Sequence, residues 1–369
     1  MSTFNLDNIL SQFLIEGKVE SVKPLGNGLI NDTFRVVTEG DAPDYVLQRI
    51  NNNIFTDVDL LQHNIEAVTG HIRRKLEAAG ADDIDRKVLR FVPTQQGKTY
   101  YLDNEGRYWR VSVFIPDAVT YEQVDPTSSR NAGKAFGEFE SMLVDLPEQL
   151  GETIPDFHNM ELRARQLQEA IEQDKAGRVA GVADIIADLQ KDMHEMCKAE
   201  RLFREGKLPK RICHCDTKVN NMMYDKQGNV LCVIDLDTVM PSFVFSDYGD
   251  FLRSAANTTA EDDPDMSHVA FNEEIFKAFT RGYIEGARFL TPVETENLPY
   301  AVALFPFMQS VRFLWDYLSG DHYWKCKYPQ HNLDRARNQM RLYQCVREHD
   351  DMMREYIKEC QQEQNTCKG

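Results

Sequence analysis

The stretch from His214 to Asp235 carries polar residues whose types and spacing suit phosphoryl transfer. It reads His-x-Asp-x-Lys-x-x-Asn over residues 214–221, and an apolar run then ends at Asp235. Phosphoryl transfer from ATP needs one carboxylate to accept the proton of the attacking hydroxyl. It also needs an amide oxygen and a second carboxylate to hold Mg²⁺ against the phosphates. We therefore predict Asp216 as the base, Asn221 and Asp235 as the metal ligands, and Lys218 as a charge that neutralises the moving phosphoryl group.

The local sequence around these residues predicts the backbone that would present them. Residues 211–213 are typical of a short strand, and residues 222–224 and 230–234 of the two arms of a hairpin, with a turn at 225–229. Asp235 would emerge at the end of the second arm. A single Asp or Asn beside a strand is more often a turn former than a catalyst. Five such positions in this order favour catalysis.

Composition sets limits on the class of protein. The chain has 369 residues, of which 42% are hydrophobic, and its formal net charge is −17. The length and the apolar fraction predict a globular protein with a large core. The negative charge argues against nucleic acid or an anionic membrane surface as the main partner. No signal peptide or long apolar run is recognisable, so we expect a cytoplasmic protein with reduced cysteines. The oligomeric state is not predicted.

The periodicity of apolar residues divides the chain into two parts. After a short opening helix (6–14), we expect strands near 19–25, 29–36 and 44–50, a helix at 60–79, and strands near 88–91 and 108–115. The remainder is mostly helical apart from the hairpin, with helices at 132–144, 275–283, 311–318 and 335–363. We predict an α+β, two-lobed fold. Residues 1–115 form a nucleotide-binding N-lobe with a small antiparallel sheet, and residues 116–369 form a mostly helical C-lobe with the catalytic loop and the acceptor site.

Several longer motifs carry a resemblance to a known group of enzymes. The chain resembles the aminoglycoside phosphotransferase and choline kinase superfamily, which has a protein-kinase-like fold, and within it the N-acetylhexosamine 1-kinases. The resemblance covers nearly the whole chain. Its narrowest motifs are Asp-Thr-Lys-x-Asn-Asn at 216–221, Ile-Asp-Leu-Asp-Thr at 234–238, and Arg-Phe-Leu-x-Asp-Tyr-Leu at 312–318.

The resemblance implies transfer of the ATP γ-phosphoryl group to the anomeric hydroxyl of GlcNAc or GalNAc. The sugar pocket would include Asp216, Arg312, Asp316 and Tyr323. The nucleotide site would include Gly26, Gly28, Asn31, Thr33, Gln48, Phe114 and Ile115, with backbone N–H groups of the glycine turn over the phosphates.

One position departs from the wider superfamily, and three alternatives stay open. The third strand usually presents Lys to the phosphates, whereas here that residue is Gln48, and the neighbouring Arg49 is a possible substitute. The acceptor is alternatively another sugar or an amino alcohol. The chain is alternatively an inactive nucleotide-binding protein. Arg312 alternatively does no more than pair with Asp316 along an exposed helix face.

Overall fold

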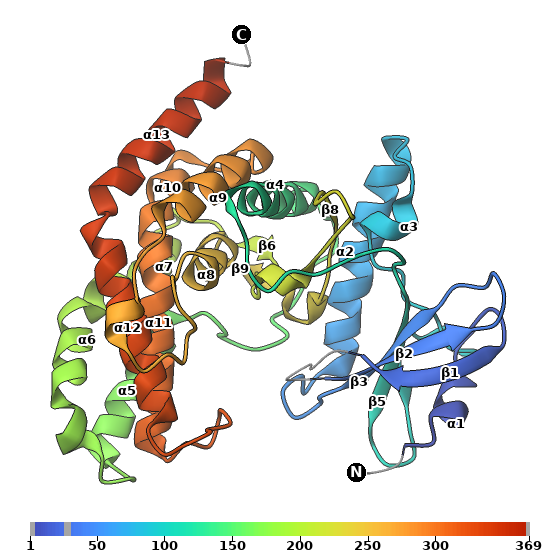
Figure 1. The fold of residues 1–369 in the computed structure, drawn as a ribbon, viewed down its shortest axis with the longest axis horizontal. Helices are drawn as coiled ribbons and strands as arrows, with labels where there is room; N and C mark the ends of the chain where they lie inside the picture. Colours follow the sequence, from blue (N-terminus) through green and yellow to red (C-terminus); the bar gives the residue numbers. More distant parts are fainter. Residues whose placement is uncertain (1–3, 26–30, 367–369) are drawn as a thin grey trace.

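The N-terminal part of the protein is built on a five-stranded antiparallel sheet. The computed structural model describes residues 4–25 and 31–366, with side chains to residue 364. The strand order is β1-β2-β3-β5-β4 (Figure 1). The strands are β1 (Val19–Pro24), β2 (Asp32–Thr38), β3 (Tyr45–Ile50), β4 (Tyr101–Leu102) and β5 (Tyr108–Val113). The predicted α+β class with a small antiparallel N-terminal sheet is confirmed.

The two faces of this sheet carry different side chains, because successive side chains of a strand point to opposite faces. One face packs on α1 (Leu6–Leu10) and buries Leu47, Trp109 and Val111 completely. On the other face Thr33 lies opposite Gln48, which in turn lies opposite Arg110. That second face therefore presents a row of polar side chains from three adjacent strands.

Helix α2 (Val58–Ala78) joins the sheet to the rest of the molecule (Figure 1). Its N-terminus is capped by the Asp57 side chain, which accepts from the backbone N–H of Leu60. Its buried face, including Leu61 and Ile65, belongs to one apolar cluster with Phe139 and Val239 from the C-terminal part. The two predicted lobes thus share a hydrophobic core. The predicted boundary at residue 115 falls just after β5.

The C-terminal part packs its helices around α11 (Leu298–Ser319), which is buried along most of its length. The other helices are α4 (Pro126–Leu143), α5 (Met160–Gln173), α6 (Ala183–Met196), α7 (Lys198–Arg204), α8 (Phe245–Ala255), α9 (Glu273–Gly286), α10 (Pro292–Glu296), α12 (His331–Glu348) and α13 (Asp350–Thr366). Helices α4 and α9 pack closely because glycines face each other. A Cβ atom on Gly133 would lie 2.2 Å from the Phe279 carbonyl oxygen, and one on Gly282 would lie 2.0 Å from that of Arg130.

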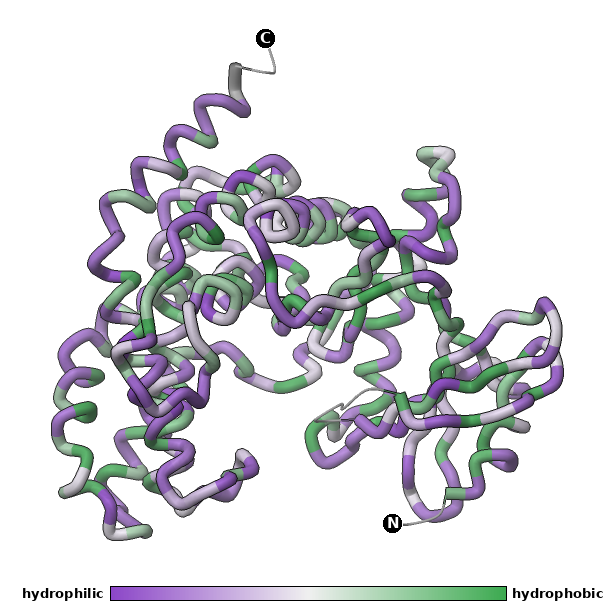
Figure 2. Tube along the Cα trace, in the orientation of Figure 1, coloured by the Kyte–Doolittle hydropathy of each residue, from purple (hydrophilic) through white to green (hydrophobic). Residues whose placement is uncertain are grey.

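Two sequence-based predictions of elements need correction. The strand expected at 88–91 is only a bridge between Phe91 and Ser112, because α3 (Ile84–Lys87) occupies the chain just before it. The single helix expected at 335–363 is two helices that break at His349. There the imidazole Nδ1 lies 2.7 Å from the carbonyl oxygen of Cys345. Hydrophobic positions recur along the mostly hydrophilic α13, so the periodicity alone gave no sign of the break (Figure 2).

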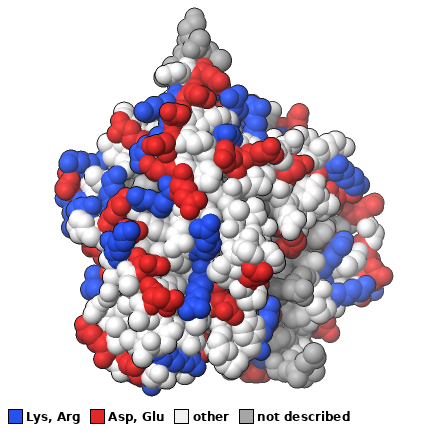
Figure 3. All heavy atoms as spheres, turned by 60° about the vertical axis from the view of Figure 1, so that its left-hand side comes forward, with Lys and Arg blue, Asp and Glu red and all other residues white. Residues whose placement is uncertain are grey.

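The surface over the C-terminal helices mixes both signs of charge. Figure 3 shows acidic and basic side chains interspersed on this face. Within the described part of the chain, no helix has both the length and the apolar composition needed to cross a membrane.

Candidate active site

The predicted catalytic residues lie together on the loop that follows β6 (Arg211–Cys213). The Lys218 ammonium nitrogen is 2.8 Å from one carboxylate oxygen of Asp216 and 3.0 Å from the other. The Asn221 amide nitrogen donates to the Asp216 backbone carbonyl at 2.8 Å and to its carboxylate at 3.3 Å. Desolvation lowers the pKa of Lys218, but the Asp216 carboxylate outweighs it, so the net pKa is raised and the lysine stays charged.

The second predicted metal ligand, Asp235, stands at the end of the hairpin of β7 (Met222–Tyr224) and β8 (Val230–Val233). Its carboxylate forms no hydrogen bond or ion pair with the described residues. Desolvation by the surrounding protein, together with the nearby Asp237 and Asp216 carboxylates, raises its pKa to about 6. The side-chain nitrogen of Asn221 is hydrogen-bonded to Asp216. The side-chain amide oxygen of Asn221 is therefore the atom that remains free to bind a metal ion. Two oxygens of this kind fit Mg²⁺, a hard cation.

The backbone of the catalytic loop is held by Asp247, from α8. Its two carboxylate oxygens accept the backbone N–H groups of His214 and Cys215, both at 2.7 Å. Cys215 has a φ of +64°, a left-handed conformation that costs a non-glycine residue about 1–3 kcal/mol. The two hydrogen bonds that the buried carboxylate accepts offset that strain. His214 is fully buried, and its Nε2 lies 2.8 Å from the Ile234 carbonyl oxygen, which ties the loop to the strand before Asp235.

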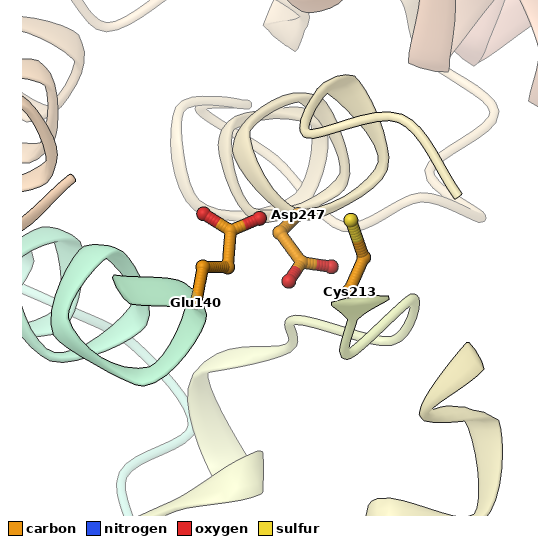
Figure 4. A group of neighbouring side chains, drawn as sticks. All are labelled: Glu140, Cys213 and Asp247. Atoms are coloured by element: carbon orange, nitrogen blue, oxygen red, sulfur yellow. The ribbon is translucent and has the colours of Figure 1, made fainter. Parts of the chain in front are cut away.

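Behind the loop, Asp247 converges with Glu140 and Cys213, from α4 and β6 (Figure 4). The Tyr283 hydroxyl donates to Glu140 at 2.5 Å. Burial, with Asp247 nearby, raises the pKa of Glu140 well above its usual value. The cluster is therefore a buried support for the catalytic loop.

On the nucleotide side, Gln48 and Arg49 are the two candidates for the position that usually presents a lysine to the phosphates, and they lie on opposite faces of the sheet. Gln48 lies on the polar face, where its amide nitrogen is 3.4 Å from the Thr33 hydroxyl. Arg49 lies on the opposite face, pairs with Asp32 at 2.5 Å, and stacks over Phe4. Arg49 therefore cannot take the place of the lysine. The side chain that joins Gln48 on the polar face is Arg110, a residue that sequence reasoning missed.

The other predicted nucleotide residues are distributed around this face. Asn31 reaches across to Asp237 at 2.7 Å. Phe114 is half-buried beneath the Arg35 guanidinium, 4.2 Å from its ring centre, and Ile115 is buried at the start of the connection to the C-terminal part. Gly26 and Gly28 lie outside the described residues.

On the acceptor side, Arg312 is half-buried between aromatic rings. Its guanidinium carbon is 5.2 Å from the centre of the Trp324 ring and 5.5 Å from that of Phe157, and it donates to the Gln309 amide oxygen at 3.0 Å. Desolvation lowers its pKa, while the Tyr323 phenol acts in the opposite direction, so that ring lies close to it. Arg312 and Tyr323 are brought together as predicted, and Arg312 does not pair with Asp316.

The structure gives Asp316 a different place from the predicted one. It is 1% exposed, and its oxygens accept the backbone N–H groups of His322, Tyr323 and Trp324 at 2.9, 2.9 and 3.1 Å. The Asn332 amide fills the remaining acceptor position at 2.8 Å. Asp316 therefore lies behind the acceptor region and shapes the loop that carries Tyr323. A helical spacing of four residues from Arg312 did not reveal this, because the partners are backbone groups of a later loop.

Sequence reasoning also missed the other groups near Arg312. Asp250 and Arg253, both from α8, form a buried ion pair at 2.9 Å. His158 hydrogen-bonds the Ser246 hydroxyl at 3.0 Å, and desolvation lowers its pKa to about 3, so the ring is neutral at pH 7. The pKa of Asp250 responds to the charges of Arg253, His158 and Lys218. The pKa of Arg312 responds to Arg253 and Asp250, and that of Lys218 to Asp216 and Asp250, so these groups lie in one region beside Asp216. The Asp-Tyr-Gly-Asp run at 247–250 is the sequence signal that could have pointed to Asp250.

The candidate base Asp216 and the candidate metal ligands Asn221 and Asp235 lie on a loop and a hairpin, an arrangement typical of kinase-like phosphotransferases. Comparison with known proteins agrees. The model of the phosphotransferase enzyme family, which includes the aminoglycoside phosphotransferases, matches residues 21–289. The chain belongs to this family of small-molecule phosphotransferases.

Solved structures show the same fold at low sequence identity. An aminoglycoside phosphotransferase from Alicyclobacillus acidocaldarius is 13% identical, with a TM-score of 0.66 over 97% of this chain and 98% of its own. A choline kinase from Cryptosporidium parvum is 14% identical, with a TM-score of 0.56 over 94% of each chain. Spectinomycin phosphotransferase, in complex with ADP and spectinomycin, is 11% identical, with a TM-score of 0.56 over 94% of this chain and 99% of its own.

Proposed function

We propose that the protein transfers the γ-phosphoryl group of ATP to the anomeric hydroxyl of an N-acetylhexosamine, giving the sugar 1-phosphate and ADP. Family membership supports phosphoryl transfer, and a similar structure with bound ADP supports a nucleotide donor. The resemblance of the 216–221, 234–238 and 312–318 motifs to N-acetylhexosamine 1-kinases supports the acceptor.

The observation that carries the choice of acceptor is the charge around Arg312. The guanidinium of Arg312 has no carboxylate within ion-pair distance among the described residues, and neither does that of its neighbour Arg163. The carboxylate of Asp250 is already paired with Arg253. Uncompensated guanidinium groups beside aromatic rings repel a cationic acceptor. They suit a neutral one whose hydroxyl and acetamido oxygens accept hydrogen bonds.

In the proposed reaction Asp216 accepts the proton of the anomeric hydroxyl. The bond from that oxygen to the γ-phosphorus forms while the bond from phosphorus to the β,γ-bridging oxygen breaks, and ADP leaves. Lys218, within 2.8 Å of Asp216, neutralises charge on the transferred group. Asn221 and Asp235 would hold Mg²⁺, which offsets the phosphate charge when bound. Arg312 and Tyr323 orient the sugar.

The decisive experiment is an ADP-release assay with Mg·ATP and a panel of acceptors, namely GlcNAc, GalNAc, glucose, galactose, choline, ethanolamine and an aminoglycoside. We expect turnover with an N-acetylhexosamine, and a phosphorus NMR signal coupled to the anomeric proton of the product. Turnover with a hexose or an amino alcohol alone would refute the acceptor. Absence of turnover with every acceptor would favour the inactive nucleotide-binding alternative.

A further inference from the structure

The absence of a lysine on β3 leaves the nucleotide side without its usual cation, and Arg110 occupies the neighbouring position. In protein kinases the β3 lysine pairs with a glutamate of the following helix. Here β3 carries Gln48, and α2 offers Gln62, whose amide oxygen is 3.5 Å from Arg110. Arg110 stands directly opposite Gln48 in the register of β3 and β5, so it projects from the same face of the sheet.

Arg110 makes its strongest contact across the molecule. Its Nη1 lies 2.5 Å from Oδ1 of Asp237, and the two side chains are 3% and 4% exposed. Its Nε donates to the Gln48 amide oxygen at 3.0 Å. That bond leaves the Gln48 amide nitrogen to face Thr33. One guanidinium therefore fixes both the glutamine of β3 and the segment that follows the metal ligand Asp235.

Asp237 is the point at which three parts of the nucleotide side meet. Its Oδ2 accepts from Asn31 at 2.7 Å, and Asn31 directly precedes β2. Its backbone carbonyl accepts from the Thr153 hydroxyl at 2.9 Å. The sheet, the start of β2 at Asn31 and the segment carrying Asp235 are all tied to one buried residue.

We propose that Arg110 is a positioning residue of the phosphoryl-transfer reaction, acting through Asp237 on the metal-binding segment and through Gln48 on the nucleotide face. The inference rests on the proposed function, because it takes Asp235 as the ligand of a nucleotide-bound cation. A buried ion pair is costly to form and is weak evidence for stability alone. Its location between the sheet and the metal segment fits a role in fixing geometry.

The test is calorimetric titration of the full chain with ATP, with and without Mg²⁺, using Arg110→Met, Asp237→Asn and the double variant. We expect each single variant to weaken Mg·ATP binding at least tenfold while binding of ATP without the metal changes less than threefold. The double variant should bind no more weakly than the poorer single variant, because the two residues act as one unit. KM for the acceptor should stay within threefold.

Arg49→Met is the matched control, because Arg49 is an ion-paired arginine of the same sheet on the opposite face. It should change Mg·ATP binding by less than threefold. If Arg110→Met does not fold, Asp237→Asn and Arg110→Lys carry the test, since the lysine keeps the charge but loses the fork that reaches both partners. Equal effects in Arg110 and Arg49 variants, or additive losses in the double variant, would overturn the proposal.

The readout separates this inference from the choice of acceptor. A parent protein that binds Mg·ATP but phosphorylates no hexosamine would refute the proposed acceptor alone, and the binding data would still decide the role of Arg110. A parent protein that does not bind Mg·ATP would overturn both proposals.

Discussion

The catalytic loop and the acceptor region are adjacent but are built in opposite ways. The loop draws Asp216, Lys218 and Asn221 from six consecutive residues, and one buried carboxylate, Asp247, fixes its backbone. The acceptor region draws its groups from α8, α11, the segment before α5 and the loop after α11. In the proposed function, a local motif therefore supplies the reacting groups, whereas the packing of distant helices forms the acceptor region. Substitutions in the first region should reduce turnover, and those in the second should affect acceptor affinity.

The largest effect is expected at the metal ligands, which belong to the reaction and not to the acceptor. Asp235→Ala should abolish Mg²⁺-dependent turnover, since it removes a charged oxygen ligand. Asn221→Ala should weaken the same step less, because a neutral oxygen is the poorer ligand for a hard cation. The measurement is activity across a Mg²⁺ titration. A parent-like metal dependence in Asp235→Ala would move the assignment to Asp237 or Asp250.

Asp216→Asn should come next, with turnover reduced by about 10²–10⁴ because a positioned base contributes about that much. Nucleotide binding should stay nearly unchanged, which can be checked by titration with ATP. Turnover within a few-fold of the parent would show that another group accepts the proton.

Arg312→Ala should affect the acceptor region and not the catalytic loop. Loss of a charged hydrogen-bond partner costs roughly 1.5–3 kcal/mol, so kcat/KM for the sugar should fall about ten- to a hundredfold. KM for ATP should stay close to the parent value. Arg281→Ala is the control, because Arg281 also lies beside an aromatic ring, that of Tyr356, but away from this region. If KM for the sugar is unchanged, or only that for ATP moves, Arg312 is not an acceptor residue.

Asp316→Asn tests whether the buried Asp316 side chain holds the loop that carries Tyr323 in the acceptor region. The amide keeps the volume but offers an N–H group where the loop presents three backbone donors. We expect the free energy of unfolding to drop by roughly 1.5–3 kcal/mol, since hydrogen bonds to a charged group are lost. KM for the sugar should rise up to tenfold with kcat little changed. Unchanged thermal stability in this variant would contradict the anchoring role.

The smallest expected effect is on the pH dependence of stability in the metal-free protein. The raised pKa of Asp235, about 6, means that the folded state binds this proton more tightly than the unfolded state does. The free energy of unfolding therefore falls as pH rises from about 4 to about 6 and stays lower above that range. Asp235→Asn should be more thermostable than the parent at pH 7.5 but not at pH 4.5, and Mg²⁺ should narrow the difference. A pH-independent difference in melting temperature would refute this account.

Local patterns predicted much of the fold. The three hairpin-linked strands, α2, the catalytic hairpin and the helical C-terminal part follow from alternation or helical periodicity within short windows. The errors arose where residues outside such a window determined the local structure. Residues 88–91 form only a bridge after a short helix, and the last helix breaks at His349 although its apolar spacing continues.

By itself, the sequence predicted the candidate reacting segment, because a base and metal ligands of this kind lie within a few residues of one strand and one hairpin. The tertiary structure alone decided which cation stands beside Gln48. Strand alternation left Gln48 and Arg49 as the candidates, but only the pairing of β3 with β5 brings Arg110, 62 positions away, to the same face. It also decided that Asp316 shapes the acceptor loop from behind, because its partners are backbone N–H groups whose positions no residue type reveals.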